Sequence, residues 1–186
     1  MPRDEASVWA WLPQGKHSNL RWELLHKAVD DADPGTRLAA GAPAPGVEGF
    51  RRTHHQARLA QELALTAGPA GPRTTAFAQT GPVALLCADL NAARAWVDAT
   101  LGALAIDDEP QARLRETVRI FLSTGGSYTA AAEQLMLHKN TVHYRVRKAE
   151  EIRGRPLQES RLDVELALSA CRWLGSAVLQ PPPASR

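Results

Sequence analysis

The sequence lacks a long hydrophobic run, a cysteine cluster and a strong excess of either charge. None of its 186 residues lies in a stretch approaching the roughly 18 to 20 apolar residues of a membrane-spanning helix, and residues 1–16 contain no signal-peptide pattern. Cys87 and Cys171 stand far apart, which favours two free thiols over a disulfide. We therefore expect a cytoplasmic protein without a disulfide framework and without a metal-binding cysteine motif.

The net charge of +2 is small, but the charges are unevenly distributed along the chain. Residues 1–110 contain 10 basic and 13 acidic residues, whereas residues 111–186 contain 12 basic and 7 acidic residues. A basic C-terminal part suggests a polyanionic partner such as nucleic acid. An asymmetry of this size also arises by chance, so it does not identify the partner by itself.

Short apolar runs alternate with amphipathic segments in the first part of the chain. The patterns predict strands at 7–13 and 36–43, helices at 18–32, 49–68 and 89–102, and a hairpin formed by strands 74–79 and 82–88. Ser18 or Asn19 is the expected N-cap of the first helix, and Asp89 that of the third. The acidic, proline-marked segment "AIDDEP" then places a domain boundary between residues 106 and 107.

Beyond this boundary the apolar spacing predicts helices only. Leu114, Val118, Phe121 and Leu122 form one stripe, and a final helix from 161 has apolar residues at 162, 166, 170 and 173 or 174. The expected all-α domain covers 107–177, and 178–186 is expected to be a disordered tail.

Two short helices separated by a three-residue turn predict a helix-turn-helix between residues 127 and 152. Ala131 and Ala132 in the first helix allow a close crossing, and Val142 and Val146, four residues apart, share one face of the second. Burial of that face turns the polar side chains of helix 139–152 outward. A solvated basic face is the ordinary alternative to a DNA-binding one.

The candidate DNA contacts come from both helices and the turn between them. Arg and Asn each bond a base edge with two groups, and Lys and Arg bind phosphates. The predicted DNA-binding residues are Ser127, Tyr128, Thr129, His138, Lys139, Asn140, Thr141, His143, Tyr144, Arg145, Arg147 and Lys148.

The run "AAAEQLMLHKNTVHYRVRKAEEIRG" closely resembles the C-terminal DNA-binding domain of the PucR/CdaR family of bacterial transcription factors. It has that family's His-x-Asn-Thr-Val-x-Tyr-Arg pattern at His138, Asn140, Thr141, Val142, Tyr144 and Arg145. The resemblance implies sequence-specific binding of double-stranded DNA in transcription regulation.

The upstream segment "GVEGFRRTHHQARLA" is similar to the part that these regulators carry before their DNA-binding domain, with Thr53 where serine is usual. The resemblance implies a cyclase-like, GGDEF-like fold for 1–106, shortened at its N-terminus and without a preceding sensor. The expected fold class is therefore α+β, with a degenerate α/β domain followed by an all-α domain.

The enzymatic alternative is a nucleotide cyclase, which needs carboxylates to hold metal ions. The segment "TGPVALLC", at the place of the GG(D/E)EF loop, contains no acidic residue, so we expect no catalytic residues, no metal and no cofactor.

We expect a homodimeric regulator that contacts its partner through the cyclase-like part. The alternative is an interaction module that forms heterodimers with full-length relatives and binds DNA weakly alone. The sequence does not indicate the effector.

Overall fold

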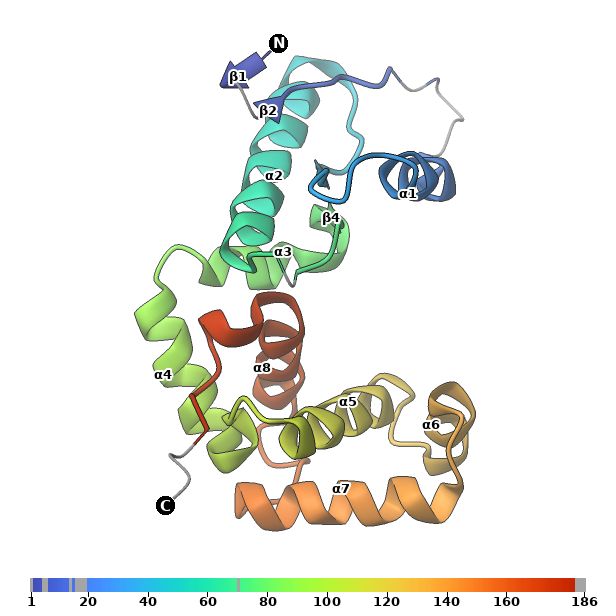
Figure 1. The fold of residues 1–186 in the computed structure, drawn as a ribbon, viewed down its shortest axis with the longest axis vertical. Helices are drawn as coiled ribbons and strands as arrows, with labels where there is room; N and C mark the ends of the chain where they lie inside the picture. The colour runs from blue at the N-terminus through green and yellow to red at the C-terminus, as the bar shows by residue number, and fades with distance from the viewer. Residues whose placement is uncertain (1, 5–6, 14, 16–19, 70, 183–186) are drawn as a thin grey trace.

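The computed structural model describes residues 2–4, 7–13, 15, 20–69 and 71–182, which form an α+β protein dominated by helices (Figure 1). The strands are β1 (Pro2–Asp4), β2 (Ser7–Val8), β3 (Leu38–Ala40) and β4 (Thr74–Ala76). The helices are α1 (Trp22–Asp30), α2 (Gly46–Thr66), α3 (Phe77–Leu86), α4 (Leu90–Leu101), α5 (Glu109–Ser123), α6 (Tyr128–Leu135), α7 (Lys139–Arg153) and α8 (Arg161–Leu174), with 3₁₀ turns η1 (Gly102–Ala105) and η2 (Gly175–Ala177). In this described part, no helix is long and apolar enough to cross a membrane.

A small β-α-β unit organises the N-terminal part. Strands β3 and β4 pair in parallel, with Leu38 opposite Thr74 and Ala40 opposite Ala76, and α2 makes the crossover between them. The Thr53 hydroxyl donates to the Ala42 carbonyl over 2.7 Å, which fastens α2 to the segment that follows β3. Gly41 lies against the backbone of Thr53 so closely that a Cβ atom would come within 2.1 Å of its carbonyl oxygen.

The predicted strand at 7–13 is wrong beyond its first two residues. Among the described residues of this segment, only Ser7–Val8 is a strand, and it pairs antiparallel with β1. Trp11 and Leu12 are exposed, so burial in a sheet does not stabilise an extended conformation there. Helix α1 begins at Trp22, and the expected caps Ser18 and Asn19 lie outside the described residues.

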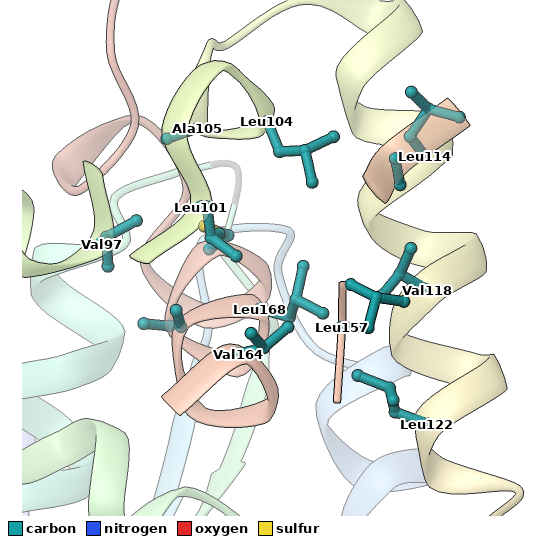
Figure 2. Packing of buried hydrophobic residues seen from close by; sticks show 14 of the residues in the cluster. Val97, Leu101, Leu104, Ala105, Leu114, Val118, Leu122, Leu157, Val164 and Leu168 are labelled. Atoms are coloured by element: carbon teal, nitrogen blue, oxygen red, sulfur yellow. The ribbon is translucent and has the colours of Figure 1, made fainter. Parts of the chain in front are cut away.

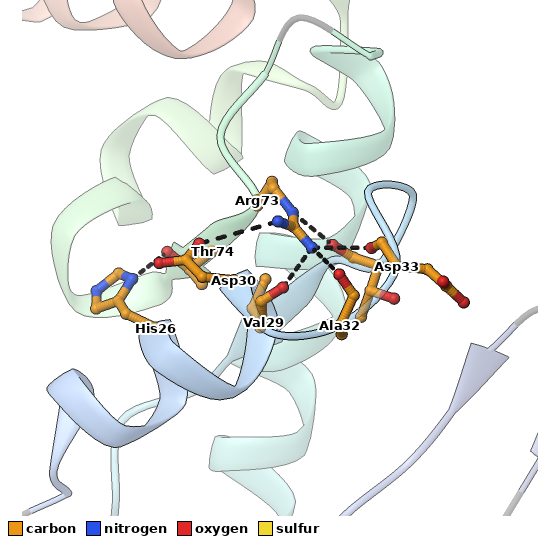
Figure 3. A network of polar contacts seen from close by, with 8 residues as sticks. His26, Val29, Asp30, Ala32, Asp33, Arg73 and Thr74 are labelled. Atoms are coloured by element: carbon orange, nitrogen blue, oxygen red, sulfur yellow. Dashed lines mark hydrogen bonds and ion pairs between the residues drawn. The ribbon is translucent and has the colours of Figure 1, made fainter.

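Arg73 fastens α1 to the sheet (Figure 3). Its guanidinium donates to the carbonyls of Val29, Ala32 and Asp33 around the C-terminal end of α1, and it lies 3.9 Å from the Asp30 carboxylate. The carbonyls of Val29 and Asp33 also accept from the amides of Ala32 and Thr36, so Arg73 adds a second donor to each, and its positive charge complements the helix dipole.

The predicted hairpin at 74–88 is wrong, because the chain turns into helix α3 directly after β4. Residues 77–86 are almost entirely apolar, and such a run does not distinguish a buried strand from a buried helix. Pro82 has no amide for a strand ladder but is tolerated in a helix with compensating contacts. The buried Thr80 hydroxyl donates to the Ala76 carbonyl over 3.0 Å, and α3 packs against both α2 and α8.

One hydrophobic core runs through α3, α4, α5 and α8 (Figure 2). Leu101 and Leu104 meet Val118 of α5 and Leu168 of α8 in the same cluster. Buried Arg115 donates to the carbonyls of Leu104 and Ile106, each over 2.6 Å, and burial lowers the pKa of its guanidinium. The core is therefore continuous across residue 106, and the division into 1–106 and 107–177 stays a prediction.

The expected disordered tail does not begin at residue 178. Val178 and Leu179 are buried, and Gln180 pairs with the linker through hydrogen bonds with Ala105 and Asp107. This segment packs because Val178 and Leu179 belong to the same hydrophobic cluster as Leu104 and Ala105. The backbone of Gln180 also pairs with the linker backbone at Ile106.

Candidate nucleic-acid interface

The first helix of the predicted pair, α6, is closed at both ends by its own sequence. The Ser127 hydroxyl accepts from the amide of Ala130 over 3.2 Å, which makes Ser127 the N-cap of α6. After Leu135, Met136 adopts a left-handed conformation, and the amide of Leu137 donates to the Ala132 carbonyl over 2.9 Å. This is a Schellman ending, and it reverses the chain within three residues.

The second helix, α7, has His138 as its N-cap and packs against the protein through an apolar face. The His138 Nδ1 accepts from the amide of Asn140 over 3.2 Å. Val142 and Val146 are buried in the same cluster as Ala131 and Ala132, which confirms the predicted packing. α7 also packs along α5, so a three-helix body fixes its orientation.

An aromatic row supports the corner where the three helices meet. The rings of Phe121 and Tyr128 lie 4.6 Å apart, and those of Tyr128 and His143 lie 5.0 Å apart. Tyr128 is half-buried as a result, whereas His143 remains exposed. Tyr128 therefore links α5 to α7 through its contacts with the rings of Phe121 and His143.

Most of the predicted DNA-binding side chains lie on the exposed side of this body. Asn140, His143, Tyr144 and Arg147 follow the spacing of one helical face, and Tyr144 is 66% exposed. Helix α7, with 15 residues, is about 22 Å long, a length and width that fit the major groove of B-DNA. The exposed predicted residues are Ser127, Thr129, His138, Lys139, Asn140, His143, Tyr144, Arg147 and Lys148.

Arg145 and Thr141 lie on the flank of α7 and are half-buried. The Arg145 Nη1 donates to the Thr117 hydroxyl of α5 over 3.3 Å. One donor of Arg145 is thus used inside the protein, and its remaining donors lie beside the exposed face rather than at its centre.

Two further arginines, Arg153 and Arg155, follow the exposed face of α7 in the sequence, but they form hydrogen bonds within the protein. Arg153 is buried, and it donates to the carbonyls of Thr100 over 2.9 Å, Pro156 over 2.6 Å and Glu159 over 3.2 Å. Arg155 donates to the Ala99 carbonyl over 2.9 Å. These cations cap the C-terminal end of α4. The inward side of Arg153 follows the helical spacing, because 153 continues the buried series 142, 146 and 149.

Two exposed cations remain loosely paired. Arg147 Nε lies 3.6 Å from the Glu151 carboxylate, and Lys148 Nζ lies 3.4 Å from it. Exposed pairs of this kind contribute roughly 0 to 1 kcal/mol, so either cation is available to a phosphate. Across the described residues, no group of histidine, cysteine and carboxylate side chains is placed to hold a metal ion.

Comparisons with known proteins match both parts of the chain. The family model of the PucR C-terminal helix-turn-helix domain matches residues 114–170, and that of the GGDEF-like domain matches residues 1–63. The first match contains α6 and α7 and the part of α5 from Leu114 onward. The second ends within α2, so it covers less than the expected domain 1–106.

Three similar proteins differ in how much of their length the chain covers. An uncharacterized protein in the pkwA 5′ region of Thermomonospora curvata is 33% identical over 159 residues, which are 84% of this chain and 83% of that protein. The purine catabolism regulatory protein of Bacillus subtilis (strain 168) is 29% identical over 102 residues, 52% of this chain. The transcriptional activator PmfR of Paenarthrobacter nicotinovorans is 37% identical over 79 residues, 42% of this chain. The matched part is 19% of the second protein and 17% of the third.

Proposed function

Since the chain belongs to the PucR/CdaR family of transcriptional regulators, we propose that it binds specific double-stranded DNA by placing α7 in the major groove. The observation that carries this proposal is the exposed face of α7, which the buried Val142 and Val146 hold outward on a fixed three-helix body. A solvated surface helix does not require such a rigid support.

Base recognition in this proposal belongs to the N-terminal half of α7. The Asn140 side chain can accept from and donate to adenine at N6 and N7, and Lys139 can donate to guanine. His143 and Tyr144 lie one turn further along the same face. Thr141 and Arg145, on the flank, contact the edge of the site or the adjacent phosphates.

Phosphate contacts surround this centre. Arg147 and Lys148 lie further along α7 and exchange their Glu151 partner for phosphate oxygens. Further contacts to the DNA backbone come from the start of α6, through Ser127, Tyr128 and Thr129. The turn before α7 adds a contact through His138. These contacts fix the register of α7 without reading the sequence.

We also propose that the protein acts as a homodimer through its N-terminal part. One helix-turn-helix reads few base pairs, and two copies on half-sites about 34 Å apart provide the usual specificity. Exposed apolar side chains lie on α2 and on the segment after β2, including Phe50 and Trp11, whose rings stack 5.7 Å apart. An exposed patch of this kind is typical of a protein contact.

The cyclase-like part is proposed to support binding and not catalysis. The segment Thr80–Cys87, where a cyclase would hold metal ions, contains no carboxylate and lies mostly within α3. Without carboxylates at this place, metal-assisted phosphoryl transfer has no ligands there.

The proposal is tested by fluorescence anisotropy with the protein's own promoter region and with scrambled DNA, each at several salt concentrations. We expect Asn140→Ala to weaken promoter binding by about 1 to 3 kcal/mol and to leave binding to scrambled DNA nearly unchanged. Asn91→Ala is the matched control, because Asn91 is an exposed asparagine on α4, outside the interface.

Equal and weak binding to both DNAs would contradict the proposal for the chain alone. The alternative would then be the heterodimer with a longer relative, which is measured by repeating the titration after the relative is added.

A further inference from the structure

A cleft of about 620 Å³ lies between α3, α5 and α8, and the DNA-binding proposal does not use it. Its walls include Gln79 of α3, Arg119 of α5, and Arg161, Ser169, Arg172 and Trp173 of α8. α5 lies between α8 and α7 (Figure 1), so the cleft opens on the side of α5 away from the recognition helix. A phosphate of DNA bound along α7 therefore does not fill it.

Two of the three arginines in the cleft are held in place by the protein. Arg119 forms a two-point contact with the Glu116 carboxylate, over 2.6 and 2.8 Å. Arg161 donates to Glu165 over 2.7 Å and to the Leu122 carbonyl over 3.0 Å. A guanidinium has five N–H donors, so both side chains retain donors while their orientation is fixed. Fixed donors lose little conformational entropy when a ligand binds.

The other polar groups of the cleft are less fully engaged by the protein, although the Ser123 hydroxyl donates to the Ile120 carbonyl over 2.9 Å. Arg172 forms no hydrogen bond or ion pair with a described residue, although its charge, after the hydrogen bond and the charge of Arg119, lowers the pKa of the Glu116 carboxyl. The Ser169 hydroxyl and the Trp173 indole N–H have no acceptor among the described residues. Arg161, Glu165, Ser169 and Trp173 follow one face of α8 at four-residue spacing. The Glu165 carboxylate on this face is already paired with Arg161, so the donors that the protein leaves unused, on Arg172, Ser169 and Trp173, suit a ligand with acceptors.

The cleft carries a positive net charge, which also favours a ligand that carries acceptors. Three arginines face one lining carboxylate, Glu165, and a second carboxylate, Glu116, stands behind Arg119. The net charge is therefore +1 even when both carboxylates are counted. Leu122 and Trp173 add apolar surface beside the charged groups.

We propose that this cleft binds a small organic anion. Its carboxylate or phosphate group accepts from Arg172 and from the free donors of Arg119 and Arg161, and its body lies against Trp173 and Leu122. Arginine binds such planar or tetrahedral oxyanions with two donors at once. A volume of about 620 Å³ is within the range of small-molecule sites. A ligand there touches α3, α5 and α8 together.

The test is an NMR titration of the ¹⁵N-labelled full chain, in one arm with inorganic phosphate and in the other with benzoate, at constant ionic strength. We expect the indole N–H signal of Trp173, identified with Trp173→Phe, to shift and saturate in at least one arm. The arm that saturates distinguishes a phosphate from a carboxylate ligand. Arg172→Gln should weaken this binding at least tenfold, whereas Arg113→Gln should leave it within twofold.

Arg113 is the matched control because it is an exposed arginine on α5, paired with Glu109 and outside the cleft. Shifts that grow linearly with both anions would overturn the proposal, and so would equal loss in the two variants. The titration contains no DNA, so its failure is distinct from a failure of the DNA-binding proposal.

Discussion

The arginines of α7 and of the loop after it differ in what surrounds them, and this decides what each can bind. Arg147 is exposed, Arg145 shares a hydrogen bond with Thr117, and Arg153 gives its donors to backbone carbonyls. The outward position of Arg147 follows from two valines four residues apart, which the sequence shows. The inward position of Arg153 depends on the carbonyls at the end of α4, more than fifty residues away in the chain.

Arg153→Met should lower the free energy of unfolding by about 2 to 4 kcal/mol, because the carbonyls of Thr100, Pro156 and Glu159 would lose their donor. Urea denaturation followed by circular dichroism measures this change. Arg155→Met is the matched control, with an expected loss below about 1 kcal/mol, because the Arg155 side chain is 43% exposed. Equal losses in the two variants would show that burial of Arg153 has no special role.

The two cysteines should react with Ellman's reagent at very different rates at pH 8. Burial raises the pKa of the Cys171 thiol to about 11, so little thiolate is present and the side chain is also shielded. Burial raises the pKa of Cys87 as well, but its thiol is only partly buried. We expect Cys87 to react in the native protein and Cys171 only when the protein unfolds. Rapid labelling of the native Cys87→Ser variant would contradict this assignment.

Helix ends were predicted in part from caps in the local sequence. The cap at Asp89 is confirmed, and so is the break between α6 and α7, whereas the Asp108 cap of α5 was not predicted. The face of α8 was predicted less well, because Leu162 is 77% exposed while Val164 and Leu168 are buried. Helix α3 was missed for a related reason: its exposed side also carries apolar residues, including Leu85, which is 63% exposed, so the apolar spacing does not indicate a helix.

Gly154→Ala should destabilise the C-terminal end of α7 by about 1 to 2 kcal/mol, since Gly154 has a φ of +76° and alanine is strained there. A Cβ atom at this position would meet open space, so steric contact is not the cause. Thermal denaturation measures the loss. Gly35→Ala, also in open space but without a left-handed φ, should leave stability unchanged or raise it by up to about 1 kcal/mol.

At the scale of the molecule, the C-terminal end of α7 is attached to the N-terminal part. Arg153 and Arg155 bond the end of α4, and the core that contains Leu101 and Leu104 also contains Val146 of α7. The sequence predicted two consecutive parts from a composition change and a proline. It did not predict how closely they pack, because each of these contacts joins segments that are distant in the chain.

Phe50→Asp should dissociate the proposed homodimer. The ring of Phe50 is 51% exposed on α2 and stacks on Trp11, so a buried charge at this place would oppose contact between two copies. Light scattering after gel filtration should give a molar mass of twice 20.2 kDa for the unmodified chain and values near 20.2 kDa for the variant.

Leu65→Asp tests whether dissociation requires a charge at the Phe50 and Trp11 patch, or follows from any replacement of an apolar residue on α2 by aspartate. Leu65 is 69% exposed near the other end of the same helix, so its variant should remain a dimer. If the DNA-bound form is this dimer, Phe50→Asp should also weaken binding to a promoter with two half-sites and leave binding to a single half-site unchanged, because α7 itself is intact. A monomeric unmodified chain, or a monomer produced by Leu65→Asp alone, would instead place the contact between copies elsewhere on the molecule.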